Sequence, residues 1–203
     1  MATEPIVIFW FRRDLRLEDN AGLWHALQSE CRVLPVFIFD INILDRLDDR
    51  HDRRISFIHG ALDALQKKLA AAGTSLKVFH DTPENAFLKI LSDFDVKAVY
   101  ANHDYEPYAV IRDMNFAAML KETAIPFHTF KDQVILEKDE VVKSDGTPYL
   151  VFTPYYNAGK QLYTQFHALS YTKGKQSLAS FVFTSPPTLE SMGFLDLHVI
   201  TVP

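Results

Sequence analysis

The stretch Ile6-Val-Ile-Phe-Trp-Phe-Arg-Arg-Asp-Leu-Arg-Leu-Glu-Asp-Asn20 decides the fold of this chain. Its first six residues are all apolar, which predicts a strand over residues 6–11 that is buried on both faces of a parallel sheet. Three arginines and three carboxylates follow directly. Open α/β sheets bind their ligands at the carboxyl ends of their strands, where this charge would lie. From chemistry alone, a solvated loop of mutual ion pairs and the rim of a ligand pocket are equally good interpretations.

The rest of the first 130 residues alternates between strand and helix patterns. Strands are expected over residues 6–11, 33–39, 75–80, 96–101 and 126–130. Helices are expected over residues 21–29, 52–72, 83–93 and 107–122. The alternation predicts an α/β fold, a doubly wound Rossmann-like five-stranded parallel sheet of order 3-2-1-4-5 with helices on both faces.

The clearest helix is the one over residues 52–72. Its apolar side chains recur every three or four residues and form one stripe, and Gly73 follows as the residue that ends it. The stripe consists of Ile55, Ile58, Leu62, Leu65 and Leu69. The charged connection over residues 45–54, just before this helix, favours a solvated loop. Arg54 can still point toward a ligand from the start of the helix.

The pattern changes after Lys131, which predicts three regions. Residues 1–131 form the α/β domain. Residues 132–169 form an exit segment that packs on this domain, with a hairpin or loop at Asp145-Gly146 and a helix over residues 154–167. The aromatic side chains over residues 149–166 are expected to pack on the sheet or on a second domain. Residues 170–203 read as an interdomain linker that contains Ser185-Pro-Pro-Thr188.

Composition excludes several function classes. The net charge of −5 argues against DNA as the main partner of this segment by itself. The single cysteine, Cys31, excludes an internal disulfide and fits a cytoplasmic protein. No apolar run is long enough to span a membrane, and no signal peptide is recognised. Neither a catalytic set, a metal site nor a glycine-rich phosphate loop stands out.

The strand order brings two charged segments together. Strands one and four are neighbours at the point where the winding reverses, so their carboxyl ends are expected to frame a crevice. Polar residues of the segment 102–106 would then face Arg12 and Arg13. An alternative role for Asp104 is to cap the helix that follows.

Four segments, taken together, resemble the DNA photolyase and cryptochrome family over residues 6 to about 160. The first is Phe9-Trp-Phe-Arg-Arg-Asp-Leu-Arg-Leu-Glu-Asp-Asn20. The second is Arg54-Ile-Ser-Phe57 with the leucines that follow. The third is Val99-Tyr-Ala-Asn-His-Asp-Tyr-Glu-Pro-Tyr108 with Arg112-Asp113, and the fourth is Asp145-Gly-Thr-Pro-Tyr-Leu-Val-Phe-Thr-Pro154.

The resemblance implies the N-terminal light-harvesting domain of a deoxyribodipyrimidine photolyase. In the family, a helical domain that holds FAD follows and repairs cyclobutane pyrimidine dimers in DNA. The full-length parent is thus expected to be a carbon–carbon lyase, with this fragment inactive alone and able to self-associate. Its partners would be that helical domain and, through the parent, damaged DNA. A cryptochrome-type blue-light receptor domain and a free-standing Rossmann-like nucleotide- or flavin-binding module are the alternatives.

The resemblance also implies an antenna chromophore on this domain. The expected binding residues are Phe11, Arg12, Ile38, Arg54, Asn102 and Asp104. Folate-binding members carry an Asn-Glu pair where this chain has Tyr108 and Ala109. A deazaflavin or flavin mononucleotide (FMN) is therefore favoured over a folate, and FAD is expected only in the absent helical domain.

Overall fold

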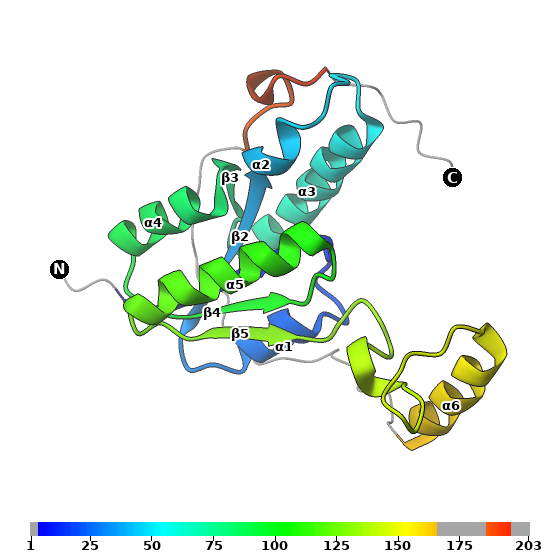
Figure 1. The fold of residues 1–203 in the computed structure, drawn as a ribbon. Helices are drawn as coiled ribbons and strands as arrows, with labels where there is room; N and C mark the ends of the chain where they lie inside the picture. Colours follow the sequence, from blue (N-terminus) through cyan, green and yellow to red (C-terminus); the bar gives the residue numbers. More distant parts are fainter. Residues whose placement is uncertain (1–3, 166–185, 196–203) are drawn as a thin grey trace.

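The centre of the molecule is a single sheet of five parallel strands (Figure 1). The computed structural model describes residues 4–165 and 186–195. The strands are β1 (Ile6–Phe11), β2 (Arg32–Asp40), β3 (Lys77–Asp81), β4 (Val96–Asn102) and β5 (Phe127–Phe130). Their order is β3-β2-β1-β4-β5, and all neighbouring pairs are parallel. The winding reverses between β1 and β4, which confirms the predicted doubly wound topology.

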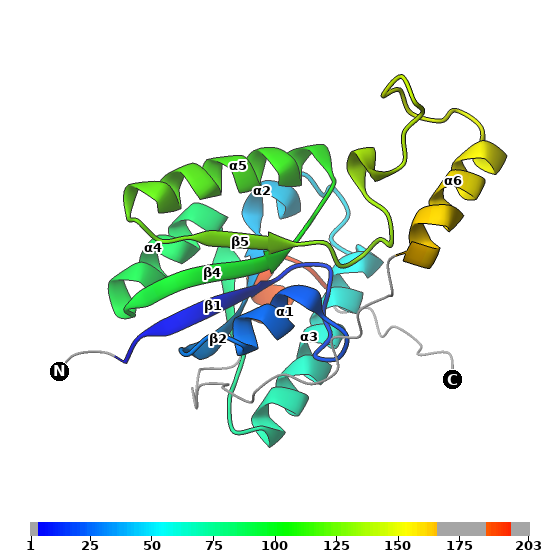
Figure 2. The ribbon, with the colours of Figure 1, turned by 90° about the horizontal axis from the view of Figure 1, so that it is seen from below.

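Helices cover both faces of this sheet, as predicted (Figure 1 and Figure 2). One face carries α1 (Ala21–Leu27) and α3 (Arg53–Ala71), and the other carries α4 (Pro83–Asp93) and α5 (Pro107–Glu122). Alternate side chains of β1 enter the two cores: Val7, Phe9 and Phe11 pack toward α1 and α3, and Ile6, Ile8 and Trp10 toward α4 and α5. A strand buried on both faces needs a continuous apolar run, which is why all six positions of β1 are apolar.

The long helix α3 follows the stripe that its sequence predicts. Asp52 caps its first turn by accepting a hydrogen bond from Arg54 N at 2.9 Å. Gly73, with φ at 80°, ends it, and Thr74 N donates to Leu69 O at 3.0 Å. The buried side chains of α3 include Ile55, Leu62, Leu65 and Leu69.

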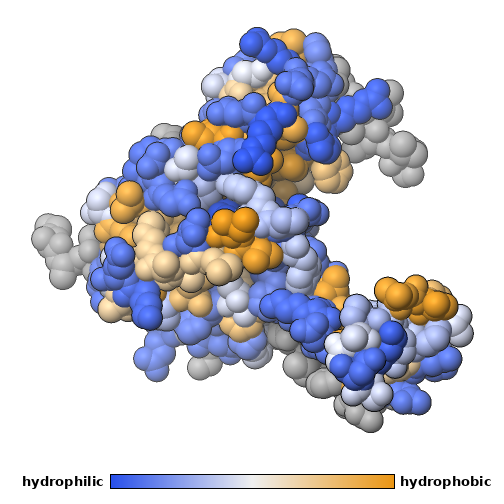
Figure 3. Space-filling model, in the orientation of Figure 1, coloured by the Kyte–Doolittle hydropathy of each residue, from blue (hydrophilic) through white to orange (hydrophobic). Residues whose placement is uncertain are grey.

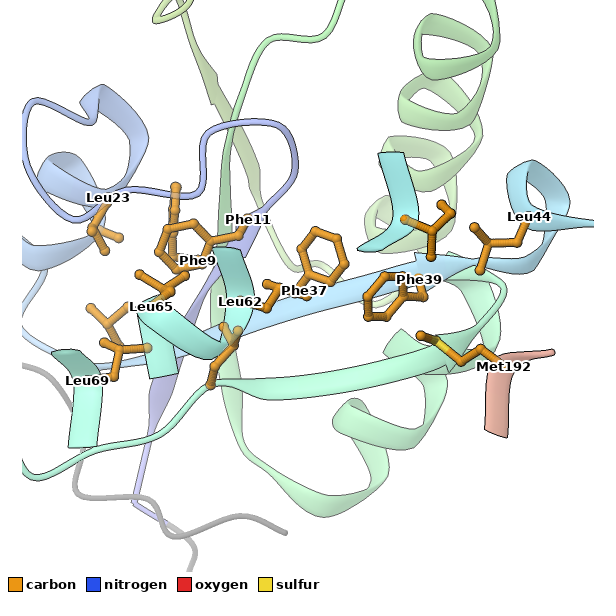
Figure 4. Packing of buried hydrophobic residues seen from close by; sticks show 14 of the residues in the cluster. Phe9, Phe11, Leu23, Phe37, Phe39, Leu44, Leu62, Leu65, Leu69 and Met192 are labelled. Atoms are coloured by element: carbon orange, nitrogen blue, oxygen red, sulfur yellow. The ribbon is translucent and has the colours of Figure 1, made fainter. Parts of the chain in front are cut away.

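A short helix, α2 (Ile41–Leu44), lies where the sequence pattern predicts only a connection. Asp40 ends β2 and caps α2, since its carboxylate accepts a hydrogen bond from Asn42 N at 3.0 Å. Leu44 then enters the core beside Phe39 (Figure 4). Four residues are too few for helical periodicity to be visible in a sequence, so a capped single turn escapes this kind of prediction.

The exit segment is attached to the α/β domain at its beginning. Asp132 accepts a hydrogen bond from Ala21 N at 2.9 Å and pairs with Arg16 at 2.7 Å. A single 3₁₀ turn, η1 (Lys138–Glu140), follows. The expected hairpin is reduced to one antiparallel bridge between Val142 and Pro148 around the turn at Gly146.

The helix of the exit segment, α6 (Phe152–Gln165), projects away from the sheet (Figure 1 and Figure 2). Phe152 is 74% exposed and Leu150, just before the helix, is 90% exposed. Figure 3 shows hydrophobic colour gathered on this outlying part of the molecule. Packing of these side chains on the sheet, one of the two sequence-based expectations, is therefore wrong. Packing on a second domain stays a prediction.

Residues 186–195, here called the C-terminal strap, return to the α/β domain. The strap makes one 3₁₀ turn, η2 (Glu190–Met192), and reverses at Gly193, whose φ is 84°. It buries three side chains in the core on the α3 side of the sheet: Leu189, Met192 and Phe194. The linker prediction does not anticipate these buried side chains, because three apolar residues around one turn are too short a signal for periodicity. The rest of the predicted linker, residues 170–185 and 196–203, lies outside the described residues.

Candidate ligand-binding cavity

A cavity of about 620 Å³ opens at the carboxyl ends of β1 and β2. Its apolar wall comes from these two strands, from α2 and from the start of α3. The apolar lining residues are Trp10, Phe11, Phe37, Ile38, Phe39, Ile43, Leu44, Leu47, Ile55, Phe57 and Ile58. The charged lining residues are Arg12, Arg13, Arg53, Arg54, Arg112, Asp40 and Asp104. Five arginines and only two aspartates line the cavity of a chain whose net charge is −5, which suits an anionic ligand.

The structure brings five of the six sequence-predicted residues together around this cavity. Phe11 and Arg12 stand at the end of β1, and Ile38 stands near the end of β2. Arg54 lies in the first turn of α3, and Asp104 follows β4. These residues come from four separate segments, and only the sheet order makes them neighbours.

Asn102 does not line the cavity. Its side chain is 4% exposed and accepts a hydrogen bond from Gly22 N at 2.7 Å. Its amide nitrogen donates to Asp14 and Asn20. A Cβ at Gly22 would lie 2.8 Å from the Asn102 side-chain oxygen and 2.9 Å from the Phe9 ring. The start of α1 therefore lies too close to β1 and β4 for any residue larger than glycine at this position. Asn102 therefore joins the loop after β1 to β4 and has no access to a ligand.

The crevice expected between β1 and β4 is filled by side chains. The space left there is about 10 Å³, room for one water molecule at most. The Asn102 network and the side chain of Arg12 occupy the gap. The cavity instead lies over β1 and β2, and it reaches the β4 side through Asp104 and Arg112.

Arg12 is held rigidly beneath one side of the cavity. Its guanidinium makes a bidentate pair with Asp113 at 2.6 and 2.9 Å, and it donates to Asn102 O at 3.1 Å. It also lies 4.3 Å from the centre of the Trp10 ring. Burial, followed by repulsion from Arg112, lowers the pKa of Arg12. The two-pronged carboxylate contact keeps the group charged and fixes its orientation.

Arg112 is a cavity residue that sequence reasoning missed. Its side chain is 7% exposed, its Nε donates to Asp113 at 3.1 Å, and it lies 4.9 Å from the Trp10 ring centre. Its Nη2 makes no hydrogen bond within the described residues, but it forms ion pairs with Asp113 Oδ1 at 3.1 Å and with Asp104 at 3.9 Å. An acceptor atom of a ligand would supply the hydrogen bond that this buried donor lacks. The Arg112-Asp113 pair in the third motif is the signal that could have revealed it.

The arginines at the cavity mouth are more exposed. Arg54 is 73% exposed and pairs with Asp52 at 2.5 Å, and the hydrogen bond that it donates to Asp52 raises the pKa of Arg54. Arg13 lies 3.6 Å from both Asp104 and Glu106. These side chains can reorient toward a ligand without disturbing the core, because water replaces the contacts that they give up.

Asp40 lines the cavity and is hydrogen-bonded to Tyr108, which lies in the first turn of α5. The Tyr108 hydroxyl donates to Asp40 Oδ2 at 2.6 Å. Burial, and then this hydrogen bond, raise the pKa of Tyr108 to about 12. Ala109, the next residue, is buried. The hydroxyl is thus already committed to Asp40, and Ala109 has no polar group to offer.

A second polar cluster holds the exit segment and lies outside the cavity. Glu137 accepts hydrogen bonds from the Tyr105 hydroxyl and from His103 Nδ1, the latter at 2.8 Å. Burial acts to raise the pKa of Glu137, but the hydrogen bonds from Tyr105 and His103 lower it overall. The cluster therefore anchors η1 to the loop after β4.

Neither a metal-binding cluster nor a membrane-spanning helix is found among the described residues. No group of three His, Cys, Asp or Glu side chains within residues 4–165 and 186–195 is placed to hold a metal ion. Within the same ranges, no helix is both long and apolar enough to cross a bilayer. The chemistry that the described part supports is binding, through an apolar slot with cationic groups.

Comparison with known proteins agrees with the fold. The sequence matches the family model described as DNA photolyase over residues 7–173. A deoxyribodipyrimidine photo-lyase of Synechococcus sp. is 30% identical over 196 residues, which cover 93% of this chain and 40% of that protein.

Two solved structures are similar as well. A bacterial class III photolyase from Agrobacterium tumefaciens superposes with a TM-score of 0.77 at 26% identity, covering 94% of this chain and 38% of that one. An archaeal photolyase from Sulfolobus tokodaii, described with two FAD molecules and a novel light-harvesting cofactor, has a TM-score of 0.63 at 34% identity, covering 74% of this chain and 33% of that one. The chain spans 33–40% of the length of these relatives.

Proposed function

Because the chain belongs to the DNA photolyase family, we propose that it is the light-harvesting domain of a parent deoxyribodipyrimidine photolyase. The domain holds an antenna chromophore in the cavity at the ends of β1 and β2. The observation that carries this proposal is the convergence of Phe11, Arg12, Ile38, Arg54 and Asp104 on one arginine-rich cavity.

The size and lining of the cavity suit a planar anionic chromophore. Its volume of about 620 Å³ falls within the range of roughly 300–1,000 Å³ that is usual for small-molecule sites. The apolar wall would contact the faces of a ring system. The Nη2 of Arg112, which lacks a hydrogen bond, and the exposed guanidinium of Arg54 would contact its anionic atoms.

A deazaflavin or FMN fits this cavity better than a folate. The positions that carry an Asn-Glu pair in folate-binding members are Tyr108, which is committed to Asp40, and the buried Ala109. The residues present therefore offer no polar pair to a folate. When bound, the chromophore would absorb light and pass the excitation energy on, and the residues of this chain would bind and orient it.

Titration with FMN, a deazaflavin and a folate, followed by ligand fluorescence, tests the assignment. We expect FMN or the deazaflavin to bind and the folate to bind at least about tenfold more weakly, which corresponds to a difference of about 1.4 kcal/mol. Arg54→Ala should weaken binding while leaving the fold intact, since its side chain is exposed. Arg112→Ala should weaken it further, because it removes a buried donor.

Arg32→Ala is the matched control. Arg32 is an equally charged, half-exposed residue at the opposite end of β2, where it pairs with Glu4 at 3.1 Å. Equal chromophore occupancy in the wild type, Arg54→Ala, Arg112→Ala and Arg32→Ala would refute the cavity assignment.

We propose that the parent, a cytoplasmic enzyme, continues into a helical domain that holds FAD and repairs damaged DNA. Membership in the photolyase family supports this, and so does the exposed apolar surface around α6. We expect the parent to repair a dimer-containing oligonucleotide in light and the 203-residue chain to be inactive. A parent that binds both chromophores but repairs no dimer would favour a cryptochrome-type receptor.

A further inference from the structure

The C-terminal strap packs directly behind the cavity. Its buried side chains Met192 and Phe194 belong to the same hydrophobic cluster as Phe39 and Leu44, two residues that line the cavity. Figure 4 shows Met192 beside Phe39, with Leu44 next to them. Phe39 and Leu44 thus form a wall with two sides: a ligand in the cavity would contact one side, and the strap packs on the other.

Two hydrogen bonds attach the strap to the two ends of this wall. Leu195 N donates to Arg50 O at 2.9 Å, in the connection between α2 and α3. His59 Nε2 lies 3.2 Å from Pro187 O and belongs to the second turn of α3. The residues between these attachment points include Arg53 and Arg54, which line the cavity mouth.

The connection between α2 and α3 has little other support. Nearly all of residues 45–54 are exposed, and Leu47 is the one apolar side chain among them that packs partly against the core. Segments with few buried contacts open locally at low free-energy cost. Arg53 and Arg54 form the first turn of α3, and the connection that leads into this turn depends on what holds Leu44, Leu47 and Arg50.

We propose that the C-terminal strap positions this wall, with Met192 and Phe194 as positioning residues for the ligand cavity. The docked strap favours the arrangement in which Leu47, Arg53 and Arg54 face the cavity, and a bound ligand favours the docked strap in return. Such coupling between two sites is reciprocal by thermodynamic necessity. The expected change in ligand affinity rests on the proposed function. The expected change in the order of the wall does not.

The first test uses the ligand-free chain and amide hydrogen exchange. Met192→Ala and Phe194→Ala should accelerate exchange in residues 41–53 more than in β1 and α5. Met192→Leu, which nearly preserves volume, should restore slow exchange. Leu195→Ala is the control, since its side chain is half-exposed and its backbone hydrogen bond to Arg50 is retained. A change spread evenly over the sheet, or none in residues 41–53, would overturn the inference.

The second test measures FMN affinity well below the unfolding temperature. The two alanine variants should bind about tenfold more weakly than the wild type, within the usual range of coupling between sites, and Met192→Leu and Leu195→Ala should bind normally. Unchanged affinity in the alanine variants would contradict the coupling. If the wild type binds no chromophore, the proposed function fails, and the exchange result still decides whether the strap positions the wall.

Discussion

Arg12 and Arg112 illustrate how single residues build the site. Both guanidinium groups contact Asp113 and both lie near the Trp10 ring, so one carboxylate serves two buried cations. Arg12 could be predicted as a cavity residue because it follows a buried strand at the end where ligands bind. For Arg112 the only sequence signal is the Arg112-Asp113 pair in the third motif, because the burial of an arginine on a helix depends on the partners that the sheet brings to it.

The Tyr108–Asp40 contact makes a pH prediction at this scale. The pKa of Tyr108 is raised from 10.0 to about 12, so the contact stabilises the protonated phenol in the folded state. This stabilisation is complete below pH 10 and is lost as the pH rises toward 12. We expect the stability of the wild type relative to Tyr108→Phe to fall over that interval, in urea unfolding at each pH.

The exposed Tyr156 provides the control for this measurement. Tyr156→Phe should retain the same loss of stability as the wild type between neutral and strongly alkaline pH. A parallel decline in the wild type and Tyr108→Phe would contradict the contact.

Among the elements, the five strands and the long helices were predictable, and the single turns were not. The apolar stripe of α3 and the apolar run of β1 repeat often enough to set a period. α2, η1 and the η2 turn of the strap are each about one helical turn long. Tertiary contacts stabilise them more than the helix propensity of their residues does. The projection of α6 was unpredictable for a related reason, since its aromatic pattern does not specify which surface it packs on.

The anchor of η1 gives an element-scale prediction. The lowered pKa of Glu137 means that its contacts with Tyr105 and His103 are fully present above about pH 4.5 and are lost as the pH falls through the lowered value. Glu137→Gln removes the charge, so we expect trypsin to cleave at Lys138 and Lys143 several-fold faster than in the wild type at neutral pH, in line with local opening.

Glu122→Gln serves as the control, because Glu122 is an exposed residue at the end of α5. Its cleavage rates at Lys138 and Lys143 should equal those of the wild type. Wild-type rates in Glu137→Gln would show that other contacts hold the segment.

For the whole molecule, the exposed surface around α6 has a measurable consequence. Leu150, Val151 and Phe152 are each more than half exposed and adjacent in sequence, an arrangement that is unusual unless a partner covers it. We expect the isolated chain to self-associate in sedimentation experiments at micromolar concentrations. Leu150→Ser combined with Phe152→Ser should make it monomeric.

Leu88→Ser is the comparison variant, since Leu88 is an exposed apolar residue on α4, far from α6 in sequence. It should leave self-association unchanged. A wild-type chain that remains monomeric at all concentrations would argue against a docking surface at α6.

The sequence by itself determined the alternation of strands and helices, the sheet order and the family, because long hydrophobic patterns and four ordered motifs carry that information. It also placed Phe11, Arg12, Ile38, Arg54 and Asp104 at strand and helix ends that face the ligand side. Only the tertiary structure decided that the cavity lies over β1 and β2, that Asn102 is sealed in a hydrogen-bond network, and that the strap supports the cavity wall. These features depend on which side chains fill the space between segments that are distant in sequence. Such packing produces no periodic pattern in the amino-acid sequence.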